Sequence, residues 1–349
     1  MRLMFVYWKL DDSGSAQTIH QLARAGRQAG HEVVLYAEPD PTYPTECSLD
    51  VESADAVVFL LEWNIYLHNN EPLDIEGPMR RCPRDRRIVI DNDGMYNDAL
   101  SVDGDYNHRS AEDARIRTEL YDRISDRIYQ PTLHPFRPGV GTYLFHGYDS
   151  TSEQSLPPGA RDYGMIYVGS NWFRWRPMSR VLRSVEPIRE RVGHIRLVGH
   201  DWTGAPWWIE PPLRDEAYQT DLGLLEGLGV EISPPVPVDQ VVPTMSRALW
   251  NPVLARPTFN HLRLVHPRLF ETPAAGTIPL FDLDEAHVKE LYGDPALELV
   301  LGEDATERIA DVLERPQHYA TAVTRVRNHL KEHHSYDVRL RELVALVEG

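Results

Sequence analysis

The chain of 349 residues contains only two cysteines, Cys47 and Cys82. Two cysteines are too few for a disulfide framework, and their surroundings lack the spacing of a structural metal site. The chain also has no segment close to the roughly 20 consecutive apolar residues of a transmembrane helix. Its first residues read as a strand and lack the apolar run of a signal peptide. We therefore expect a cytoplasmic protein without a membrane span.

Positive charge is also scarce: 36 Lys and Arg residues stand against 53 Asp and Glu residues, and the formal net charge is −17. Because phosphate backbones are bound by basic surfaces, this balance argues against nucleic acid or an anionic membrane as a partner. Arginine greatly outnumbers lysine, and a guanidinium can bind a phosphate through two hydrogen bonds. The arginines grouped in predicted loops are Arg174, Arg176, Arg256, Arg263 and Arg268.

The N-terminal segment lacks the Gly-x-Gly-x-x-Gly fingerprint of dinucleotide-binding proteins. Residues 2–8 read as a strand, residues 16–29 as an amphipathic helix that ends at Gly30, and residues 31–36 as a second strand. This order is a βαβ unit of the doubly wound type. The first unit is therefore expected to be Rossmann-like without being a dinucleotide site.

Two successive βα series follow one another along the chain. Strands at 54–61 and 87–90 continue the first series, residues 150–162 read as a linker, and a strand at 163–168 opens the second series. In such sheets, ligands bind at the carboxyl ends of the strands. If two sheets face one another, the ligands should therefore bind between the two sheets. The predicted divisions are residues 1–155 for the acceptor domain, 156–325 for the donor domain and 326–349 for the end of a long helix spanning 317–347.

The most informative segment is HPRLFETPAAGTIPL, residues 266–280. A polar loop enters a short helix that carries Glu271, Gly276 ends the helix, and residues 277–281 read as a buried strand. Free N–H groups at a helix start suit phosphate oxygens, and a carboxylate beside them can accept hydrogen bonds from a ribose diol. The segment predicts a nucleotide-sugar site. The alternative is an ordinary acid at a helix start above an Ala-Gly packing contact.

The pattern R-x-F-E-x-P-A-A-G-x-x-P-L at residues 268–280 resembles the donor segment of group 1 glycosyltransferases with the GT-B fold, closest to the CgeB-like branch. The larger family reads Glu-x7-Glu, with the second acid on the donor ribose. Glu271 matches the second position, whereas the first falls on Arg263, where the chain departs from the pattern. The resemblance covers most of the second half and is only topological over the first.

The resemblance implies an α/β protein of two facing Rossmann-like domains, with a C-terminal helix crossing back to the first domain. It also implies transfer from a nucleotide-diphosphate sugar, here expected to be a UDP-sugar, without a metal and with retention of configuration. Arginines and the backbone of a Gly-containing turn would then hold the diphosphate. The expected donor-binding residues are Gly169, Ser170, Asn171, Arg174, Gly199, His200, Pro235, Val236, Asn260, Arg268, Phe270 and Glu271.

Asp12, Asp91 and Arg263 are the expected catalytic residues. Asp12 follows the first strand and can serve as a base or simply cap a helix, and a retaining enzyme needs no dedicated base. Asp91 and Asp93 form an Asp-x-Asp pair, which in the GT-A fold binds a divalent cation and a diphosphate. The alternative is a turn before Gly94. The second βα series favours the turn, with Asp91 pointing toward the acceptor.

Five tryptophans gather in predicted loops of the second half and can stack on a sugar or base, or pack as core: Trp172, Trp175, Trp202, Trp207 and Trp208.

The sequence thus predicts a glycosyltransferase of the hexosyltransferase type that acts on a small-molecule acceptor, with no further cofactor. A homodimer is compatible with these features. An epimerase or hydrolase on the same fold would turn over without an acceptor. A degenerate GT-B binding protein, supported by the missing first Glu, would bind nucleotides weakly.

Overall fold

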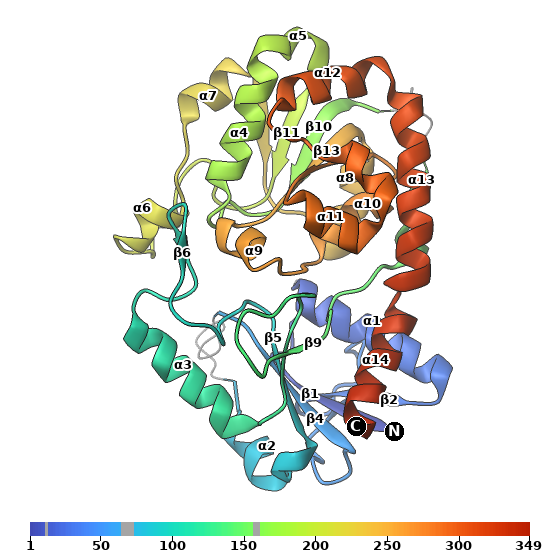
Figure 1. Cartoon of the computed structure of the whole chain (residues 1–349). Coiled ribbons are helices and arrows are strands. Elements are labelled where there is room, and N and C mark those ends of the chain that lie inside the picture. Colours follow the sequence, from blue (N-terminus) through green and yellow to red (C-terminus); the bar gives the residue numbers. More distant parts are fainter. Residues whose placement is uncertain (11–12, 64–72, 156–160) are drawn as a thin grey trace.

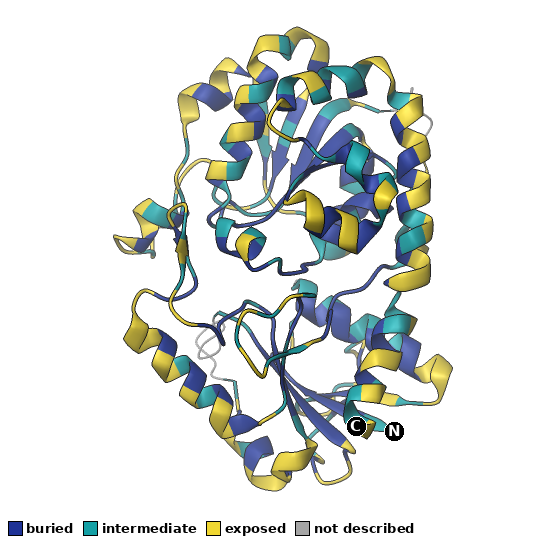
Figure 2. Ribbon diagram, viewed as in Figure 1, coloured by how far each residue is buried: buried dark blue, intermediate teal, exposed yellow. Residues whose placement is uncertain are grey.

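The computed structural model describes residues 1–10, 13–63, 73–155 and 161–349. Two α/β units lie one above the other, and both ends of the chain lie in the first unit (Figure 1). The strands of both sheets are buried beneath helices whose outer faces are exposed (Figure 2). The α/β class and the pair of parallel sheets agree with the prediction.

The first sheet has the strand order β3-β2-β1-β4-β5-β8-β9, and all of its neighbouring strands are parallel. The chain runs outward from β1 in one direction and then crosses to β4, so the order reverses between these two strands. Every side chain of β4 is buried, as expected for a parallel strand covered on both faces. The strands are β1 Arg2–Val6, β2 Glu32–Tyr36, β3 Cys47–Ser48, β4 Ala56–Leu61, β5 Arg87–Asp91, β8 Ile128–Gln130 and β9 Gly141–Thr142.

The second sheet has the order β12-β11-β10-β13-β14 and is also parallel throughout. Its order reverses between β10 and β13. Ligands in open α/β sheets bind at such a reversal, beyond the carboxyl ends of the strands. The strands are β10 Tyr163–Val168, β11 Ile195–Val198, β12 Val230–Ser233, β13 Ala248–Leu254 and β14 Ile278–Asp282.

Helix α1, Gly14–Ala29, shows why local sequence defines these elements well. The side chain of Ser13 accepts a hydrogen bond from the N–H of Ala16 at the start of the helix. Gly30 ends it with a φ of 76°, a left-handed conformation that glycine adopts without strain. The remaining helices are α2 Glu76–Arg81, α3 Ala111–Ile124, α4 Trp175–Val185, α5 Arg189–Val192, α6 Leu213–Ala217, α7 Leu222–Gly227, α8 Val241–Ser246, α9 Pro257–His261, α10 Arg268–Ala274, α11 Glu285–Tyr292, α12 Ala305–Glu314, α13 Pro316–His333 and α14 Tyr336–Glu348, with short 3-10 turns η1 Arg84–Arg86, η2 Ser150–Ser152, η4 Glu186–Ile188, η5 Val238–Gln240 and η6 Asp294–Leu299.

The single C-terminal helix predicted over residues 317–347 is wrong, because the structure has two helices there. Helix α13 ends at His333, and Ser335 has an extended backbone and caps α14 by accepting from the N–H of Val338. The N–H of Tyr148 donates to the carbonyl of His334 at 2.7 Å and fixes the break. Helix α13 packs on the second unit, and α14 packs on α1 of the first. The C-terminal segment therefore crosses back to the first unit at the break between α13 and α14.

A short hairpin that the sequence did not predict extends from the first unit to the second (Figure 1). It consists of β6, Ser101–Val102, and β7, Asp105–Tyr106. Each strand has two residues, which is too short for a recognisable alternation. Asp103 and Gly104 form its tip, with φ values of 50° and 79°. In the described part of the chain, no helix combines the length and apolar character needed to cross a bilayer.

Candidate functional site

The reversal points of the two sheets lie where the two units contact one another. Tyr7 and Glu62 follow β1 and β4 on one side, and Gly169 and Arg256 follow β10 and β13 on the other. The indole rings of Trp63 and Trp172, from opposite sides, are 5.2 Å apart between centroids. A carbon added at Gly14 would lie 2.7 Å from the ring of Pro267. These contacts define an interdomain site.

Glu62 is the acid at the centre of the first-unit side, and the sequence analysis missed it. Tyr7 donates its hydroxyl to Oε2 of Glu62 at 2.9 Å, and Asn92 donates its amide to Oε1 at 3.1 Å. Ser15 donates its hydroxyl to the same Oε1. Burial, followed by the negative charge of Asp93, raises the pKa of Glu62 to about 7. A carboxyl group with such a pKa can exchange a proton near neutral pH.

Asp93 is the second acid of the site, and its negative charge acts on Glu62. Its Oδ2 accepts from the N–H of Trp63 at 2.7 Å. Burial raises the pKa of Asp93, while the Trp63 N–H and the positive charges of Arg256, Arg174 and Arg117 oppose that shift. Two of these arginines come from the second unit. Asp93 therefore lies where charges from both units meet.

Asp91 does not point toward an acceptor, which corrects the expectation. Its side chain is fully buried, and its carboxylate accepts 2.8 Å bonds from the N–H groups of Met95 and Tyr96. Gln130 donates to it at 2.7 Å. Asp91 stabilises the turn at Gly94, whose φ is 71°. The paired cation site of the GT-A hypothesis is therefore wrong, because the fold is not GT-A and the two carboxylates of the Asp-x-Asp pair have separate partners.

Asp12 lies outside the described residues, so its predicted role has no structural test. The neighbouring Ser13 caps α1, as the alternative interpretation of this turn expected. His146 is buried and bonded to the hydroxyl of Thr18 at 2.8 Å. Burial lowers the pKa of His146 to about 3, so this ring is neutral at physiological pH. Its role here is structural.

The loop after β10 makes a close backbone contact with the loop after β11. A carbon added at Gly199 would lie 2.2 Å from the carbonyl oxygen of Gly169, so only glycine fits at this position. Trp202 donates its indole N–H to the same oxygen at 2.8 Å and is completely buried. Glycine at both positions lets a ligand approach the backbone closely. Ser170, which follows Gly169, is partly exposed at this edge.

Asn171 is part of the frame of this loop, contrary to its predicted role as a ligand. The side chain is fully buried, and its amide nitrogen donates to the carbonyls of Asp201 and Gln219 and to the hydroxyl of Thr220. These bonds join three separate segments. The residue therefore shapes the donor-side loops without reaching a ligand.

Arg268 and Glu271, both predicted to contact the donor, lie together beside the carboxyl end of β10. Arg268 donates Nε to the carbonyl of Val168 at 2.7 Å and pairs with the carboxylate of Glu271. Helix α10 has only seven residues, so side-chain cations rather than a long helix dipole carry the positive charge here. Both side chains are about one-quarter exposed and can meet a ligand.

Arg174 adds a second guanidinium between the two units. Its Nη1 donates to the carbonyls of Ser170 and Trp172 at 3.4 Å. Its positive charge acts on Asp93 across the gap and on His266. Burial, assisted by that charge, holds the pKa of His266 well below its usual value. The donor side therefore carries fixed positive charge from arginine and a neutral histidine.

The loops predicted for the nucleobase lie at adjacent strand ends. The N–H of Gly199 donates to the carbonyl of Ser233 at 3.0 Å, which joins the ends of β11 and β12. His200 and Pro235 are exposed there, and Val236 is partly buried. These residues are compatible with a base-binding edge beside the Gly169 loop.

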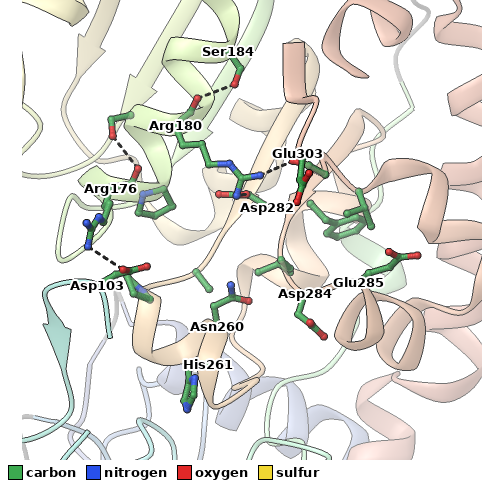
Figure 3. A pocket seen from close by; sticks show the side chains of 18 of the residues that line it. Asp103, Arg176, Arg180, Ser184, Asn260, His261, Asp282, Asp284, Glu285 and Glu303 are labelled. Carbon is green, nitrogen blue, oxygen red and sulfur yellow. Dashed lines mark hydrogen bonds and ion pairs between the residues drawn. The ribbon is translucent and has the colours of Figure 1, made fainter. Parts of the chain in front are cut away.

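Three predicted site residues lie elsewhere: the donor-binding residues Asn260 and Phe270, and Arg263, which was expected to be catalytic. Phe270 is 2% exposed and packs against His334 in the core. Arg263 forms ion pairs with Asp284 at 2.9 Å and Glu290 at 3.5 Å. Both Arg263 and Asn260 line a separate open groove of about 1380 Å³. Figure 3 shows this groove, in which Arg180 from α4 reaches Asp282 at the end of β14 and forms an ion pair with it at 2.7 Å.

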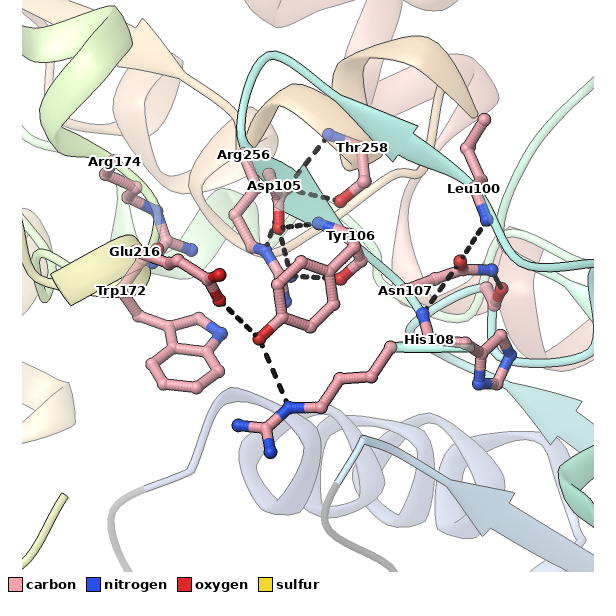
Figure 4. Close-up of polar contacts among 12 residues, drawn as sticks. Leu100, Asp105, Tyr106, Asn107, His108, Trp172, Arg174, Glu216, Arg256 and Thr258 are labelled. Carbon is pink, nitrogen blue, oxygen red and sulfur yellow. Dashed lines mark hydrogen bonds and ion pairs between the residues drawn. The ribbon is translucent and has the colours of Figure 1, made fainter. Parts of the chain in front are cut away.

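The hairpin binds the second unit through a buried polar cluster (Figure 4). Asp105 pairs with Arg256 at 2.6 Å, and its other oxygen accepts from the N–H of Thr258 at 3.0 Å. Tyr106 donates its hydroxyl to Glu216 at 2.9 Å. The only sequence signal for this cluster was an Arg-Pro step directly after a buried strand.

The tryptophans of the second half serve different purposes. Trp202 is core, whereas Trp172 contacts the rings of Trp63, Phe173 and Tyr218 at the interdomain site. Trp207 and Trp208 are 88% and 63% exposed. The aromatic group at the interface therefore depends on Trp172 and on Trp63, which the sequence analysis had not selected.

Residues 176–345 match the family model described as glycosyl transferase-like. A search of curated proteins found no match. Among solved structures, the T4 phage BGT in complex with UDP and Mn²⁺ aligns with a TM-score of 0.60 and 12% identity, covering 100% of this chain and 99% of that chain. An alpha-glucosyltransferase in complex with UDP-glucose and DNA containing an abasic site aligns with a TM-score of 0.64 and 12% identity, covering 100% and 99%.

Anabaena HepE in complex with UDP aligns with a TM-score of 0.61 and 12% identity, covering 99% of each chain. At these identities the likeness establishes the fold and no more. The CgeB-like branch stays a prediction. The chain thus has the GT-B fold, and its residues 176–345 carry the match to the glycosyl transferase-like family.

Proposed function

We propose that this protein is a glycosyltransferase that moves a sugar from a UDP-sugar to a hydroxyl group of a small-molecule acceptor. One observation carries the proposal: Asp93, whose charge acts on Glu62 at one sheet reversal, feels the positive charges of Arg174 and Arg256 at the other. An acceptor and an activated donor need such opposite charges on the two sides of one cleft. Glu271 and Arg268 lie on the donor side.

The donor would lie along the carboxyl ends of the second sheet. Glu271 accepts hydrogen bonds from the ribose hydroxyls, and Arg174 and Arg268 bind the diphosphate. The backbone of Gly169 and Ser170 approaches the phosphates, because no side chain intervenes at the glycine. The base would lie beside His200 and the Pro235 loop. Known structures of this fold bound to UDP or UDP-glucose support a uridine donor by analogy.

Glu62 is the proposed base. It takes the proton from the acceptor hydroxyl as the oxygen forms a bond to the anomeric carbon of the sugar. The bond between that carbon and the diphosphate oxygen breaks, and the electron pair leaves with UDP. Arg174 and Arg268 stabilise the negative charge that develops on the leaving group. The hydrogen bonds from Tyr7, Ser15 and Asn92 hold Glu62 in position.

A base placed opposite the donor favours direct displacement, which inverts the anomeric configuration. The sequence resemblance favours retention instead, and the neighbours include both beta- and alpha-glucosyltransferases. We infer inversion from Glu62, because a retaining reaction would not require an ionisable base on the acceptor side. Proton NMR of the product anomer decides between the two, and retention would remove the proposed role of Glu62.

Charge neutralisation by two arginines supports metal-independent transfer. One solved neighbour contains Mn²⁺ with UDP, so this point needs its own test. Activity should persist when EDTA is added to a protein freed of metals. A strict requirement for added Mn²⁺ or Mg²⁺ would contradict this part of the proposal without affecting the donor site itself.

The main test is thermal stabilisation by UDP, GDP, ADP and TDP, with EDTA present. A ligand that binds only the folded protein must raise the melting temperature. We expect a shift with UDP that is lost in Glu271→Ala and retained in Glu226→Ala, because Glu226 is exposed on α7. No shift with any nucleotide would contradict the proposal. UDP release from a UDP-sugar without an acceptor would favour a hydrolase.

A further inference from the structure

A cavity smaller than the groove of Figure 3 lies where Trp63, the hairpin and helix α3 meet. Its volume is about 360 Å³, which suits a small organic ligand. Its wall is aromatic and aliphatic, and its polar side carries two arginines and one acid, Asp113. Its lining residues include Trp63, Met95, Tyr106, Arg109, Ile116 and Arg117.

Two residues that line the cavity are linked to the acids of the site. Trp63 directly follows Glu62 in the chain, and its backbone N–H donates to Asp93 at 2.7 Å. Arg117 donates to the carbonyl of Trp63 at 2.8 Å and acts electrostatically on Asp93. Trp63 and Arg117 therefore connect the cavity wall to Asp93, and Trp63 connects it along the chain to the proposed base.

The aromatic wall is held in place by the second unit. The ring of Trp63 contacts that of Trp172 edge-on, and the ring of Tyr106 contacts that of Phe173 at 5.4 Å between centroids. The Tyr106 hydroxyl is also bonded to Glu216. Two rings fixed in this way form a preorganised wall for a flat ligand. Ile116 is 46% exposed and supplies apolar surface from α3.

The cavity also has a cation available to a ligand. Arg109 is exposed, and its Nε makes a long bond of 3.4 Å to the Tyr106 hydroxyl. Among the described residues it has no ion pair with an acid. His108, which also lines the cavity, bonds to the carbonyl of Met95, and burial lowers its pKa. Arg109 is therefore suited to bind an acidic group of the ligand.

We propose that this cavity is the acceptor subsite, and that the acceptor is a small aromatic alcohol or phenol that carries an acidic group. The ring packs against Trp63 and Tyr106, the acidic group binds Arg109, and the hydroxyl reaches Glu62. This inference rests on the proposed glycosyltransferase function. The chain's net charge of −17 disfavours a nucleic-acid acceptor, although nucleobases also stack on aromatic rings.

The test measures UDP release and glycoside formation from UDP-glucose with 4-hydroxybenzoate, its neutral analogue 4-hydroxybenzyl alcohol, and a duplex containing 5-hydroxymethylcytosine. We expect turnover of the benzoate with a KM about tenfold below that of the neutral analogue, which corresponds to one charge-assisted contact. Arg109→Gln should remove this tenfold preference. Ile116→Trp should fill the cavity and raise the KM of both compounds at least tenfold. Neither change should alter UDP affinity.

Arg115→Gln is the matched control for Arg109→Gln, because Arg115 lies six positions further along the chain, on α3, and pairs with Glu112 and Glu119 at the surface. It should behave as the unaltered protein. Turnover of the duplex in preference to both aromatic compounds would overturn the inference. So would KM values unchanged in Arg109→Gln and Ile116→Trp. Donor binding with no use of an aromatic acceptor would also overturn it, whereas loss of donor binding itself would contradict the proposed function.

Discussion

Asp105 and Arg256 form a buried ion pair that joins the two halves of the chain. Their side chains are 1% and 5% exposed, and the closest oxygen and nitrogen are 2.6 Å apart. The guanidinium of Arg256 also lies over the rings of Phe173 and Phe259, at 4.8 and 5.0 Å from their centroids. Its positive charge opposes the rise in the pKa of Asp93. One pair thus fixes the hairpin and contributes to the charge balance of the cleft.

Asp105→Ala should strongly destabilise the protein, because it leaves Arg256 buried without its counter-ion. The expected cost is about 3–5 kcal/mol in the free energy of unfolding, measured by urea denaturation. Asp103→Asn at the hairpin tip is the control, since its pair with Arg176 is exposed and should contribute less than about 1 kcal/mol. Equal effects of the two substitutions would show that the buried pair has no special role.

Glu62→Gln should lower kcat by about 10²–10⁴ while leaving UDP affinity unchanged, because a base acts on the acceptor and not on the nucleotide. In the unaltered enzyme, kcat should rise with pH up to about 7, the pKa of Glu62, as the carboxyl group loses its proton. This rise of kcat with pH should be absent in the variant. Glu52→Gln, at an exposed position, is the control. A variant with kcat within threefold of the original would refute the assignment.

The same substitution should change how stability depends on pH. The pKa of Glu62 is about 7 in the folded protein and near 4.5 when exposed, so the folded state binds this proton more tightly. Its contribution to stability is fully present below about pH 4.5 and is lost as the pH rises through 7. The total loss is of the order of 3 kcal/mol.

Because Gln mimics the protonated acid, Glu62→Gln should be more stable than the unaltered protein at pH 8. This difference in stability should be much smaller at pH 5, where Glu62 is itself protonated. Urea denaturation at pH 5, 6, 7 and 8 measures the difference. The exposed Glu52→Gln variant should show a difference that does not vary with pH. An equally constant difference for Glu62→Gln would mean that its carboxyl group titrates normally.

The fold could be predicted because its signals are local. The apolar run at β4, the Ser13 cap and the left-handed Gly30 each define an element within a few residues of sequence. The pairing of Arg268 with Glu271 was also accessible, since residues three apart meet on a helix. These features need no knowledge of distant contacts.

The acids of the site could not be identified in this way. Burial and the negative charge of Asp93 raise the pKa of Glu62, while the hydrogen bonds from Tyr7 and Asn92, 55 and 30 positions away in the chain, oppose that rise. Only the folded sheet brings these groups together. The prediction that Asp91 points toward the acceptor is wrong because its carboxylate accepts hydrogen bonds from two N–H groups of the following turn. The hairpin escaped notice because strands of two residues carry no periodicity.

Gly199→Ala should disrupt the donor loop. The residue has a φ of 148°, and its added carbon would lie 2.2 Å from the oxygen and 2.6 Å from the carbon of the Gly169 carbonyl. The backbone of Gly169 must therefore move, which also disturbs its bond to Trp202. We expect a loss of about 2–4 kcal/mol in stability and at least a tenfold weaker UDP affinity, measured by calorimetry well below the melting temperature.

Gly227→Ala is the matched control for this substitution, because a carbon added there meets nothing within 4 Å. Gly227 ends α7, so alanine should change stability by less than about 1 kcal/mol and leave UDP affinity intact. If Gly199→Ala binds UDP as tightly as this control while it is clearly destabilised, the diphosphate does not contact the Gly169 loop. The donor would then have to lie along Arg268 and Glu271 without that backbone contact.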